Sequence, residues 1–572
     1  MTSTPTQRQT RELRFSADHP RYKWVALSNT TLGMLIATIN SSIVIISLPA
    51  IFRGIHLDPL GAGNVGYLLW MIMGFLVVSA VLVVMLGRLG DLYGRVKVYN
   101  LGFAVFAVSS VVLSLDPLHG GAGAMWLIVG RVVQGVGGAM LFANSAAILT
   151  DAFPARERGM ALGINNVAAV AGSFLGLVIG GLLSEWHWRA VFWVSVPIGI
   201  IGTIWGYLSL HELGTTRSRR GMDLWGNLTF AVGLTSLLVA ITYGIQPYGD
   251  HATGWANPWV VTGLVGGAAL LVVFAVVETR VDDPMFSMSL FRIRPFWAGN
   301  LALLLSATSR GGMQFMLIIW LQGIWLPLHG YDYETTPLWA GIYLLPLTVG
   351  FLVAGPISGK LSDRYGARAF ATGGMVLVAI SFLGFLVLPV DFAYWQFAGL
   401  LLLNGLASGL FAAPNSSMIM NAVPANQRGA ASGMRGTFMN SGMALSIGIF
   451  FSLMVAGLAA NLPQSLRSGL TGQGVPAHVA GQVADLPPVG SLFASFLGFN
   501  PIQTLLKPFG VLGDLSTGQA HTLTGKTFFP QLISAPFHDG LVVVFLAAAL
   551  MSLVAAVASW LAGGKYVHVD EE

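Results

Sequence analysis

Apolar runs of about 20 residues alternate along the chain with short polar segments. An α-helix needs a run of this length to cross the hydrocarbon core of a bilayer, so each run predicts one membrane-spanning helix. We expect fourteen spans, at residues 25–50, 65–86, 98–115, 124–147, 160–184, 188–210, 224–245, 258–278, 297–322, 338–358, 369–388, 394–419, 430–458 and 539–562. The pattern therefore predicts an all-α polytopic membrane protein.

One polar stretch occurs twice. GRLGDLYGRVK at residues 87–97 returns as GKLSDRYGAR at residues 359–368, each time directly after an apolar run. Other pairs lie 270 positions apart, such as Gln134-Gly135 and Asn404-Gly405. Matches at one spacing predict two copies of a six-helix unit, with the spans at 224–245 and 258–278 as an insertion between them.

The repeat and the polar segments together predict the domain organisation. We expect a cytoplasmic tail at 1–24, a six-helix bundle at 25–210, two inserted helices with their linkers at 211–295, a second six-helix bundle at 296–562 and a cytoplasmic tail at 563–572. The second bundle includes a large extracytoplasmic segment at 459–537. Because this segment is poor in charge, we expect short amphipathic elements on the membrane face or over a cavity, with a loop as the alternative.

Composition and charge set the class and the orientation. Charged residues make up 9% of the chain, against about 25% in soluble domains. Of the 29 Lys and Arg residues, 21 fall in segments on the side of the two tails and five on the other side. Basic residues favour the cytoplasmic side, so both termini are expected there.

The same counts exclude several other functions. The formal charge of +5 reflects the topology, so it gives no reason to expect a nucleic-acid partner. The absence of cysteine excludes disulfides, thiolate chemistry and cysteine-ligated metals. Nucleotide loops, zinc spacings and nucleophile elbows do not occur in a plausible context, so we expect neither a cofactor nor an enzyme.

Polar side chains inside the spans are the candidate site. An arginine at this depth is costly unless it meets water, a carboxylate or backbone carbonyls, so we expect these side chains to point inward. The predicted substrate cavity consists of Asn40, Arg131, Gln134, Arg310, Gln314 and Arg435. The alternative is that each arginine bonds to neighbouring helices and only stabilises their packing.

Four stretches resemble the major facilitator superfamily, and specifically its fourteen-helix drug:proton antiporter branch. GRLGDLYGRVK resembles the signature loop after the second helix, and LIVGRVVQG at 127–135 resembles the motif of the fourth helix. The glycine series from Gly163 to Gly181 is similar to the antiporter motif, and WRAVFWVSVPIG at 188–199 is similar to the start of the sixth helix. The resemblance covers about residues 25–562.

This resemblance implies two six-helix bundles that rock about a central cavity, in an alternating-access transporter without a cofactor. It implies a monomer in the bacterial plasma (inner) membrane, surrounded by membrane lipids and handling a small amphiphilic substrate or a lipid. It also implies a cytoplasmic gate made of Gly87, Asp91, Gly94, Arg95, Asp363, Arg364 and Gly366. The chain departs from the family at Asn40, where an Asp is usual, and at Gly176-Leu177, where Gly-Pro is usual.

The position of the acids bears on the energy source and the substrate. None of the 24 Asp and Glu or 11 His residues falls in the middle third of a span, so only boundary acids such as Glu185 and Asp151 are candidate proton carriers. Three arginines without an acid predict export of anionic or zwitterionic amphiphiles, including lipids. The alternatives are a proton-coupled multidrug exporter of cationic or hydrophobic drugs, driven by the proton-motive force, and an importer.

Overall fold

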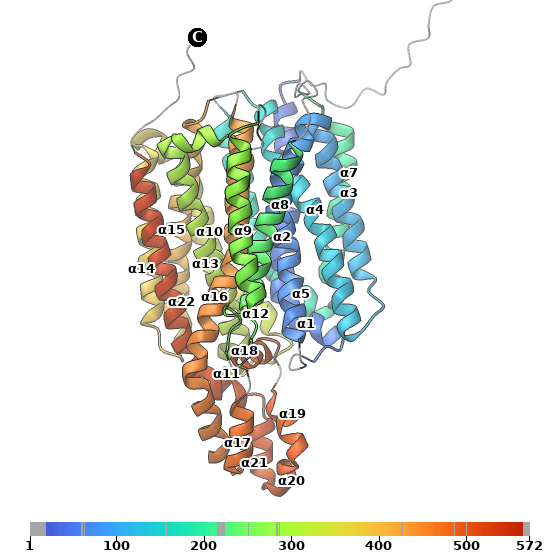
Figure 1. The fold of residues 1–572 in the computed structure, drawn as a ribbon, viewed down its shortest axis with the longest axis vertical. Coiled ribbons are helices and arrows are strands. Elements are labelled where there is room, and N and C mark those ends of the chain that lie inside the picture. The colour runs from blue at the N-terminus through green and yellow to red at the C-terminus, as the bar shows by residue number, and fades with distance from the viewer. Residues whose placement is uncertain are drawn as a thin grey trace, which may run out of the picture.

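The computed structural model describes residues 19–563 except 59–60, 62, 155–156, 214–222, 250, 282–283, 285, 425–426, 486 and 499, and except the side chains of 158–159, 363 and 428–429. Fourteen helices within the described residues are long and apolar enough to cross a membrane, as the hydropathy pattern predicts. The described chain begins and ends at the same end of the molecule (Figure 1), which fits an even number of spans.

The N-terminal bundle, blue to cyan in Figure 1, comes first. Its helices are α1 (Tyr22–Gly54), α2 (Asn64–Tyr93), α3 (Arg95–Ser114), α4 (Gly120–Ala152), α5 (Arg158–Trp186), α6 (Ala190–Trp193) and α7 (Ser195–Ser209). The expected span at 188–210 is therefore two helices with a break at Val194. The inserted helices are α8 (Leu224–Gly244) and α9 (Pro258–Glu278), and the 3-10 turn η1 (Met288–Arg292) follows them.

The C-terminal bundle, from light green to red in Figure 1, repeats the plan. It consists of α10 (Arg294–Trp320), the π-helical turn η2 (Leu321–Trp325), α11 (Leu326–Leu328), α12 (Thr336–Tyr343), α13 (Leu345–Tyr365), α14 (Ala367–Leu386), α15 (Tyr394–Asn421), α16 (Arg428–Gly472) and α22 (Phe528–Leu561). Between α16 and α22 lie α17 (Ala477–Ala484), α18 (Pro488–Phe496), α19 (Ile502–Leu506), η4 (Lys507–Phe509), α20 (Val511–Asp514) and α21 (Thr517–Thr524).

Equivalent hydrogen bonds in the two bundles show their pseudo-symmetry. The side-chain amide of Gln134 on α4 donates to the Ser110 hydroxyl on α3 at 2.8 Å. The side-chain amide of Asn404 on α15 donates to the Ser381 hydroxyl on α14 at 2.7 Å. The repeat detected in the sequence is therefore a repeat of helix contacts.

The repeated loop turns the chain sharply at a glycine in each bundle. Gly94 joins α2 to α3 with φ of 113°, and Gly366 joins α13 to α14 with φ of 95°. Residues with a side chain rarely adopt this backbone conformation, which explains why glycine stands at both positions. We call the end of the molecule that carries these two turns the loop end, and the opposite end the cap end.

The two bundles touch closely at the cap end. A Cβ atom on Gly181 of α5 would lie 2.5 Å from the Leu338 Cα on α12. A Cβ atom on Gly341 of α12 would lie 3.0 Å from the carbonyl oxygen of Leu177 on α5. Backbones approach this closely only where side chains are absent, so these glycines close the cap end.

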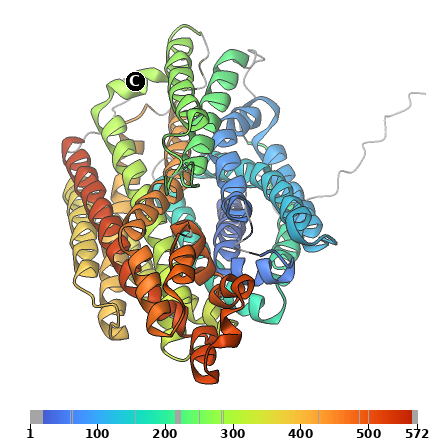
Figure 2. The same ribbon diagram turned by 60° about the horizontal axis from the view of Figure 1, so that its bottom comes forward.

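Helices, not a loop, fill the segment between the last two spans. Helix α16 runs for 45 residues and continues beyond the bundle, where α17 packs against its extension and α19 to α21 lie nearby (Figure 1). Helix α18 differs from the other helices of this segment because it lies between the bundles, with every residue but Gly490 buried. With the cap end forward, the other cap helices, orange and red, lie mainly over the C-terminal bundle (Figure 2).

Candidate functional site

A cavity of about 750 Å³ lies between the two bundles. Its walls come from α1, α2, α4 and α5 on one side and from α10, α13, α15 and α16 on the other. Both copies of the repeat thus contribute the same set of helices. A volume of this size accommodates a drug-sized molecule or part of a lipid.

The cavity reaches the surface at the loop end. Its lining includes Thr150 near the end of α4, Met160 near the start of α5 and Asn421, the last residue of α15. In the other direction it ends well short of the cap end, at Arg310 on α10 and Ser41 on α1. The closed glycine contact and α18 lie beyond that point, so the cavity is open at one end.

The lining carries positive charge without a compensating acid. Its basic residues are Arg310, Lys360 and Arg435, and it includes no Asp, Glu or His from the described part of the chain. Arg310 makes no hydrogen bond or ion pair with a described residue. The structure thus places two of the six predicted cavity residues, Arg310 and Arg435, in the lining.

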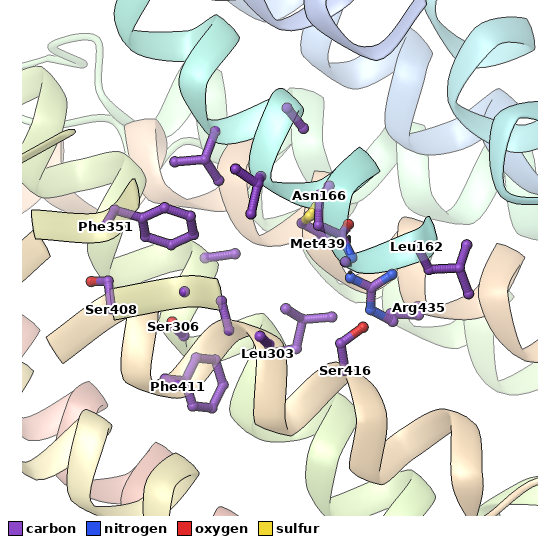
Figure 3. A pocket seen from close by; sticks show the side chains of 18 of the residues that line it. Leu162, Asn166, Leu303, Ser306, Phe351, Ser408, Phe411, Ser416, Arg435 and Met439 are labelled. Atoms are coloured by element: carbon purple, nitrogen blue, oxygen red, sulfur yellow. Dashed lines mark hydrogen bonds between the residues drawn. The ribbon is translucent and has the colours of Figure 1, made fainter. Parts of the chain in front are cut away.

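Arg435 is tied to the opposite bundle. Its Nη2 donates a hydrogen bond of 3.1 Å to Oδ1 of Asn166 on α5 (Figure 3). Its Nε is buried without a hydrogen-bond partner. Figure 3 shows both side chains at the wall near Leu162 and Met439, with Phe351 and Phe411 further along the cavity.

Small hydroxyl groups and apolar side chains make up the rest of the lining. Seven of its residues are serines: Ser41, Ser79, Ser173, Ser306, Ser408, Ser416 and Ser417. The apolar lining includes the rings of Phe75, Phe142, Phe351 and Phe411. The surface can therefore hold a polar head through hydrogen bonds and an apolar tail through contact.

Arg131 lies outside this lining, in contrast to the prediction. Its side chain is 1% exposed and donates to the side-chain oxygens of Asn40 and Gln134 and to the Met71 carbonyl oxygen. Asn40 also donates to Ser195 on α7, so the group joins four helices of one bundle. Phe75 packs against the guanidinium at 4.6 Å and presents its ring to the cavity. Neutral acceptors thus surround the charge within the bundle.

Gln314 is also absent from the lining. It lies one turn after Arg310 on α10 and is half-buried. Hydropathy places both residues deep in one span, but it does not say which face of the helix meets the cavity. Four of the six predicted cavity residues, Asn40, Arg131, Gln134 and Gln314, therefore lie outside the cavity lining.

The predicted gate residues of the N-terminal bundle meet at the loop end. The guanidinium of Arg95 contacts Asp91 and Asp151, each at 2.7 Å. This cluster joins α2, α3 and α4 next to Gly87, and so lies within one bundle. The sequence indicated the pair Asp91 and Arg95, and the structure adds Asp151, which we had considered as a proton carrier.

Glu212 is a member of this loop-end site that the motif did not reveal. Its carboxylate accepts hydrogen bonds from the backbone amides of Arg95 at 2.7 Å and Val96 at 3.1 Å, the first two residues of α3. These amides have no partner within the helix. The available signal was an acid following the sixth span on the same side as the repeated loop.

The loop end of the C-terminal bundle has a different arrangement of charged side chains. Arg364 is exposed and packs on the ring of Tyr365 at 5.4 Å, while Arg368 packs on Trp560 at 4.8 Å. Asp363 was predicted to form the second gate pair, but its side chain lies outside the described residues. At the position equivalent to Asp151 the chain has Asn421, which lines the cavity.

The two candidate proton carriers lie away from the cavity lining. Glu185 is exposed at the cap end of α5. Asp151 is next to Thr150, a lining residue, but its own carboxylate faces Arg95. A proton role for either residue stays a prediction.

Comparison with known proteins gives the family. The model of the Major Facilitator Superfamily matches residues 30–447. The chain is 27% identical to the tetracenomycin C resistance and export protein of Streptomyces glaucescens, over 93% of this chain and 90% of that protein. It is 30% identical to the methyl viologen resistance protein SmvA of Salmonella typhimurium, over 79% and 86%.

A solved structure shows the same fold. The inward-facing, unoccupied bacterial homologue of the human lysosomal transporter Spinster matches with a TM-score of 0.55 and 14% identity, covering 95% of this chain and 98% of that one. The fourteen candidate spans fit the fourteen-helix branch that the sequence resembles. Because the family model covers most of its length, this chain belongs to the major facilitator superfamily.

Proposed function

We propose that this protein is an alternating-access exporter of amphiphiles with an anionic or zwitterionic head, including lipids. The observation that carries the proposal is a cavity lined by Arg310, Lys360 and Arg435 with no acid among its described lining residues. The relatives named for export and resistance support outward transport of small molecules.

Electrostatics decides between an anionic and a cationic cargo. A unit charge 4 Å from one of these side chains gains or loses about 4 kcal/mol at an effective dielectric constant of 20. An anion gains this energy and a cation loses it. The difference is larger than any preference that the cavity's serine hydroxyls give to one charge over the other, because a neutral hydrogen bond contributes about 1 kcal/mol.

The orientation follows from the basic residues. With the loop end on the cytoplasmic side, where we place both termini, the cavity opens toward the cytoplasm and the cap lies outside. An exporter loads from this state. The gate cluster of Asp91, Arg95 and Asp151 then lies beside the cytoplasmic mouth, where the helices must move together before the cap end can open.

The test uses purified protein in phosphatidylcholine vesicles. NBD-labelled lysophosphatidylglycerol is compared with ethidium, each with and without a pH gradient, and dithionite quenching reports the lipid that remains outside. We expect the anionic lipid to move and ethidium to stay, with lipid movement lost in the double variant Arg310→Gln/Arg435→Gln.

The opposite result supports the second candidate function. Ethidium movement driven by the pH gradient, without movement of the lipid, overturns the proposal in favour of a proton-coupled exporter of cationic drugs. In that case Asp151→Asn and Glu185→Gln identify the proton carrier. Lysophosphatidylcholine as a third probe separates an anionic from a zwitterionic preference.

A further inference from the structure

Three side-chain hydrogen bonds between described residues join the two bundles. Two of them lie at the cap end, from Gln322 to the Ile46 carbonyl and from Arg53 to the Leu497 carbonyl. The third is the bond from Arg435 to Asn166, which lies inside the cavity. A ligand that enters from the loop end therefore meets this third link between the bundles, which we call the clasp.

The neighbouring residue holds Asn166 in position. The side-chain amide of Asn165 donates to the Ser145 hydroxyl on α4 at 2.9 Å and is 4% exposed, so it faces the interior of its own bundle. Successive residues on a helix point about 100° apart, which turns Asn166 toward the cavity. The pair Asn165-Asn166 thus fixes one side of the clasp on α5.

Arg435 retains unused hydrogen-bonding capacity. A guanidinium carries five N–H donors, and Asn166 accepts from one nitrogen while Nε is buried without a partner. No acid from the described residues lines the cavity to neutralise it. An anion adds an attraction between full charges that a neutral amide oxygen lacks, so it competes successfully with the amide oxygen for the guanidinium.

Asn166 remains a hydrogen-bonding partner when an anion binds. Its oxygen accepts from Arg435 in the empty cavity, and after a half-turn of the amide its NH₂ group donates to an oxygen of the anion instead. The direct bond between the bundles is then replaced by a bridge through the ligand. A head with two or more acceptor oxygens on one atom, such as a phosphate or carboxylate, has the geometry for both partners.

Resting on the proposed function, we propose that Arg435 and Asn166 form the headgroup site and that an anion replaces the direct bond between the two bundles by a bridge through the ligand. The clasp makes the link between the bundles depend on the ligand, since only an anion replaces the direct bond by a bridge. It also sets specificity for heads that present several oxygens. Arg310 is separate from the clasp. Its neighbour Gly311 packs against Met443, eight residues after Arg435 on α16, so Arg310 lies about 12 Å deeper along the bundle.

Binding is measured on the full-length protein in phosphatidylcholine nanodiscs with two probes that share one tail. Dodecyl phosphate presents an anion and dodecyltrimethylammonium a cation. We expect Arg435→Gln to weaken dodecyl phosphate binding about ten- to hundredfold, the loss of a charge-assisted hydrogen bond, and Asn166→Ala to weaken it about three- to tenfold. Asn461→Ala is the matched control, since it removes an exposed asparagine from the same helix as Arg435, outside the cavity lining.

The variant Asn166→Asp tests the competition directly. A carboxylate at this position pairs with Arg435 from within the chain, so dodecyl phosphate affinity falls as in Arg435→Gln although the arginine is present. If Asn166→Asp binds dodecyl phosphate like the wild type, the clasp is not the headgroup site. Asn166→Ser, too short to bridge, gives a second variant in case the alanine protein fails to fold.

The distance between the two bundles is measured with spin labels, which the cysteine-free chain accepts at chosen positions without background. Tyr93 and Tyr365 are equivalent exposed residues at the loop end of the two bundles, so Tyr93→Cys and Tyr365→Cys report the distance between them. Dodecyl phosphate should change this distance in the wild-type background, because the direct bond becomes a bridge through the ligand, and leave it unchanged in Asn166→Ala. An equal change in both proteins, or no change in either, overturns the clasp.

The two proposals fail in different ways. If the wild type binds dodecyl phosphate no more tightly than dodecyltrimethylammonium, the anionic substrate class itself is wrong. If the wild type prefers the anion and Arg310→Gln, but not Arg435→Gln, removes the preference, the exporter proposal stands and the clasp is rejected.

Discussion

Arg131 donates a hydrogen bond to the side-chain oxygen of Asn40, where α4 meets α1 inside the N-terminal bundle. The carboxamide oxygen of Gln134, at 2.6 Å, accepts a second hydrogen bond from the same nitrogen. Neutral acceptors therefore surround the buried guanidinium, and one of them, Asn40, stands at the position where the family usually has an Asp. This neutral arrangement distinguishes Arg131 from Arg310, which faces the cavity.

Replacing Arg131 should destabilise the fold. In Arg131→Gln the buried oxygens of Asn40 and Gln134 lose their donor, and each unsatisfied group costs about 1–3 kcal/mol. We expect the midpoint of thermal unfolding in detergent to fall. The matched variant Arg310→Gln removes a charge without a described partner, so its midpoint should stay the same or rise. Equal midpoints for wild type and Arg131→Gln would contradict the structural role.

The glycine contact at the cap end should be sensitive to a single methyl group. Gly181→Ala places a Cβ 2.5 Å from the Leu338 Cα, so the cap end cannot close fully and the outward-open state gains population. Cysteines introduced on both sides of this contact should react faster with a membrane-impermeant maleimide. Gly163→Ala is the control on the same helix, because its Cβ meets no atom within 4 Å. Equal labelling in both variants would argue against the seal.

Glu212 should stabilise the first turn of α3. In Glu212→Gln the carboxylate that accepts from the Arg95 and Val96 amides becomes neutral, a loss comparable to that of a helix cap, about 1 kcal/mol. Hydrogen exchange of these two amides should become about fivefold faster. Glu185→Gln, at an exposed acid, should leave the rates unchanged. Unaltered exchange in Glu212→Gln would show that water replaces the carboxylate.

We expect Asp116, at the cap end, to make the stability of the folded protein depend on pH. It lies in the turn between α3 and α4, and burial raises the pKa of its carboxyl, while the Leu118 amide and Arg189 act in the opposite direction. The folded pKa is above the unfolded value, so its stabilising contribution is complete below pH 3.8 and is lost as the pH rises through the raised pKa.

The corresponding variant is Asp116→Asn, which keeps the acceptor for the Leu118 amide without an ionisable group. Its thermal unfolding midpoint should exceed that of the wild type at pH 7 and approach it near pH 4. A constant difference between the two proteins across this range would mean that the carboxyl does not titrate with a raised pKa.

Hydropathy was sufficient to predict all fourteen spans, but it misplaced their ends. Membrane thickness limits the apolar part of a helix and not the helix itself. The thirteenth span was expected at 430–458, whereas α16 continues to Gly472 because its extension packs against the cap. The ninth span contains the π-helical turn Leu321–Trp325, which a hydropathy profile does not register.

The candidate site was predictable only in its residue types. An arginine in a span must find polar partners, and the sequence indicated this for Arg131, Arg310 and Arg435 alike. Which partners it finds depends on the rotation of each helix about its axis, and this follows from packing between distant segments. Arg131 therefore met Asn40 inside one bundle, while Arg435 met Asn166 across the cavity.

The excess of basic side chains in the cavity also has a consequence for how the membrane potential acts on transport. A carrier with no carboxylate facing its cavity among the described residues has no evident site there for exchanging a proton with its cargo. An anion that leaves an inside-negative cell moves down the electrical gradient, which contributes about 2.3 kcal/mol per charge at 100 mV, roughly a fiftyfold concentration ratio. For a singly charged anionic cargo, the voltage by itself would thus drive export against a concentration ratio of up to about fifty.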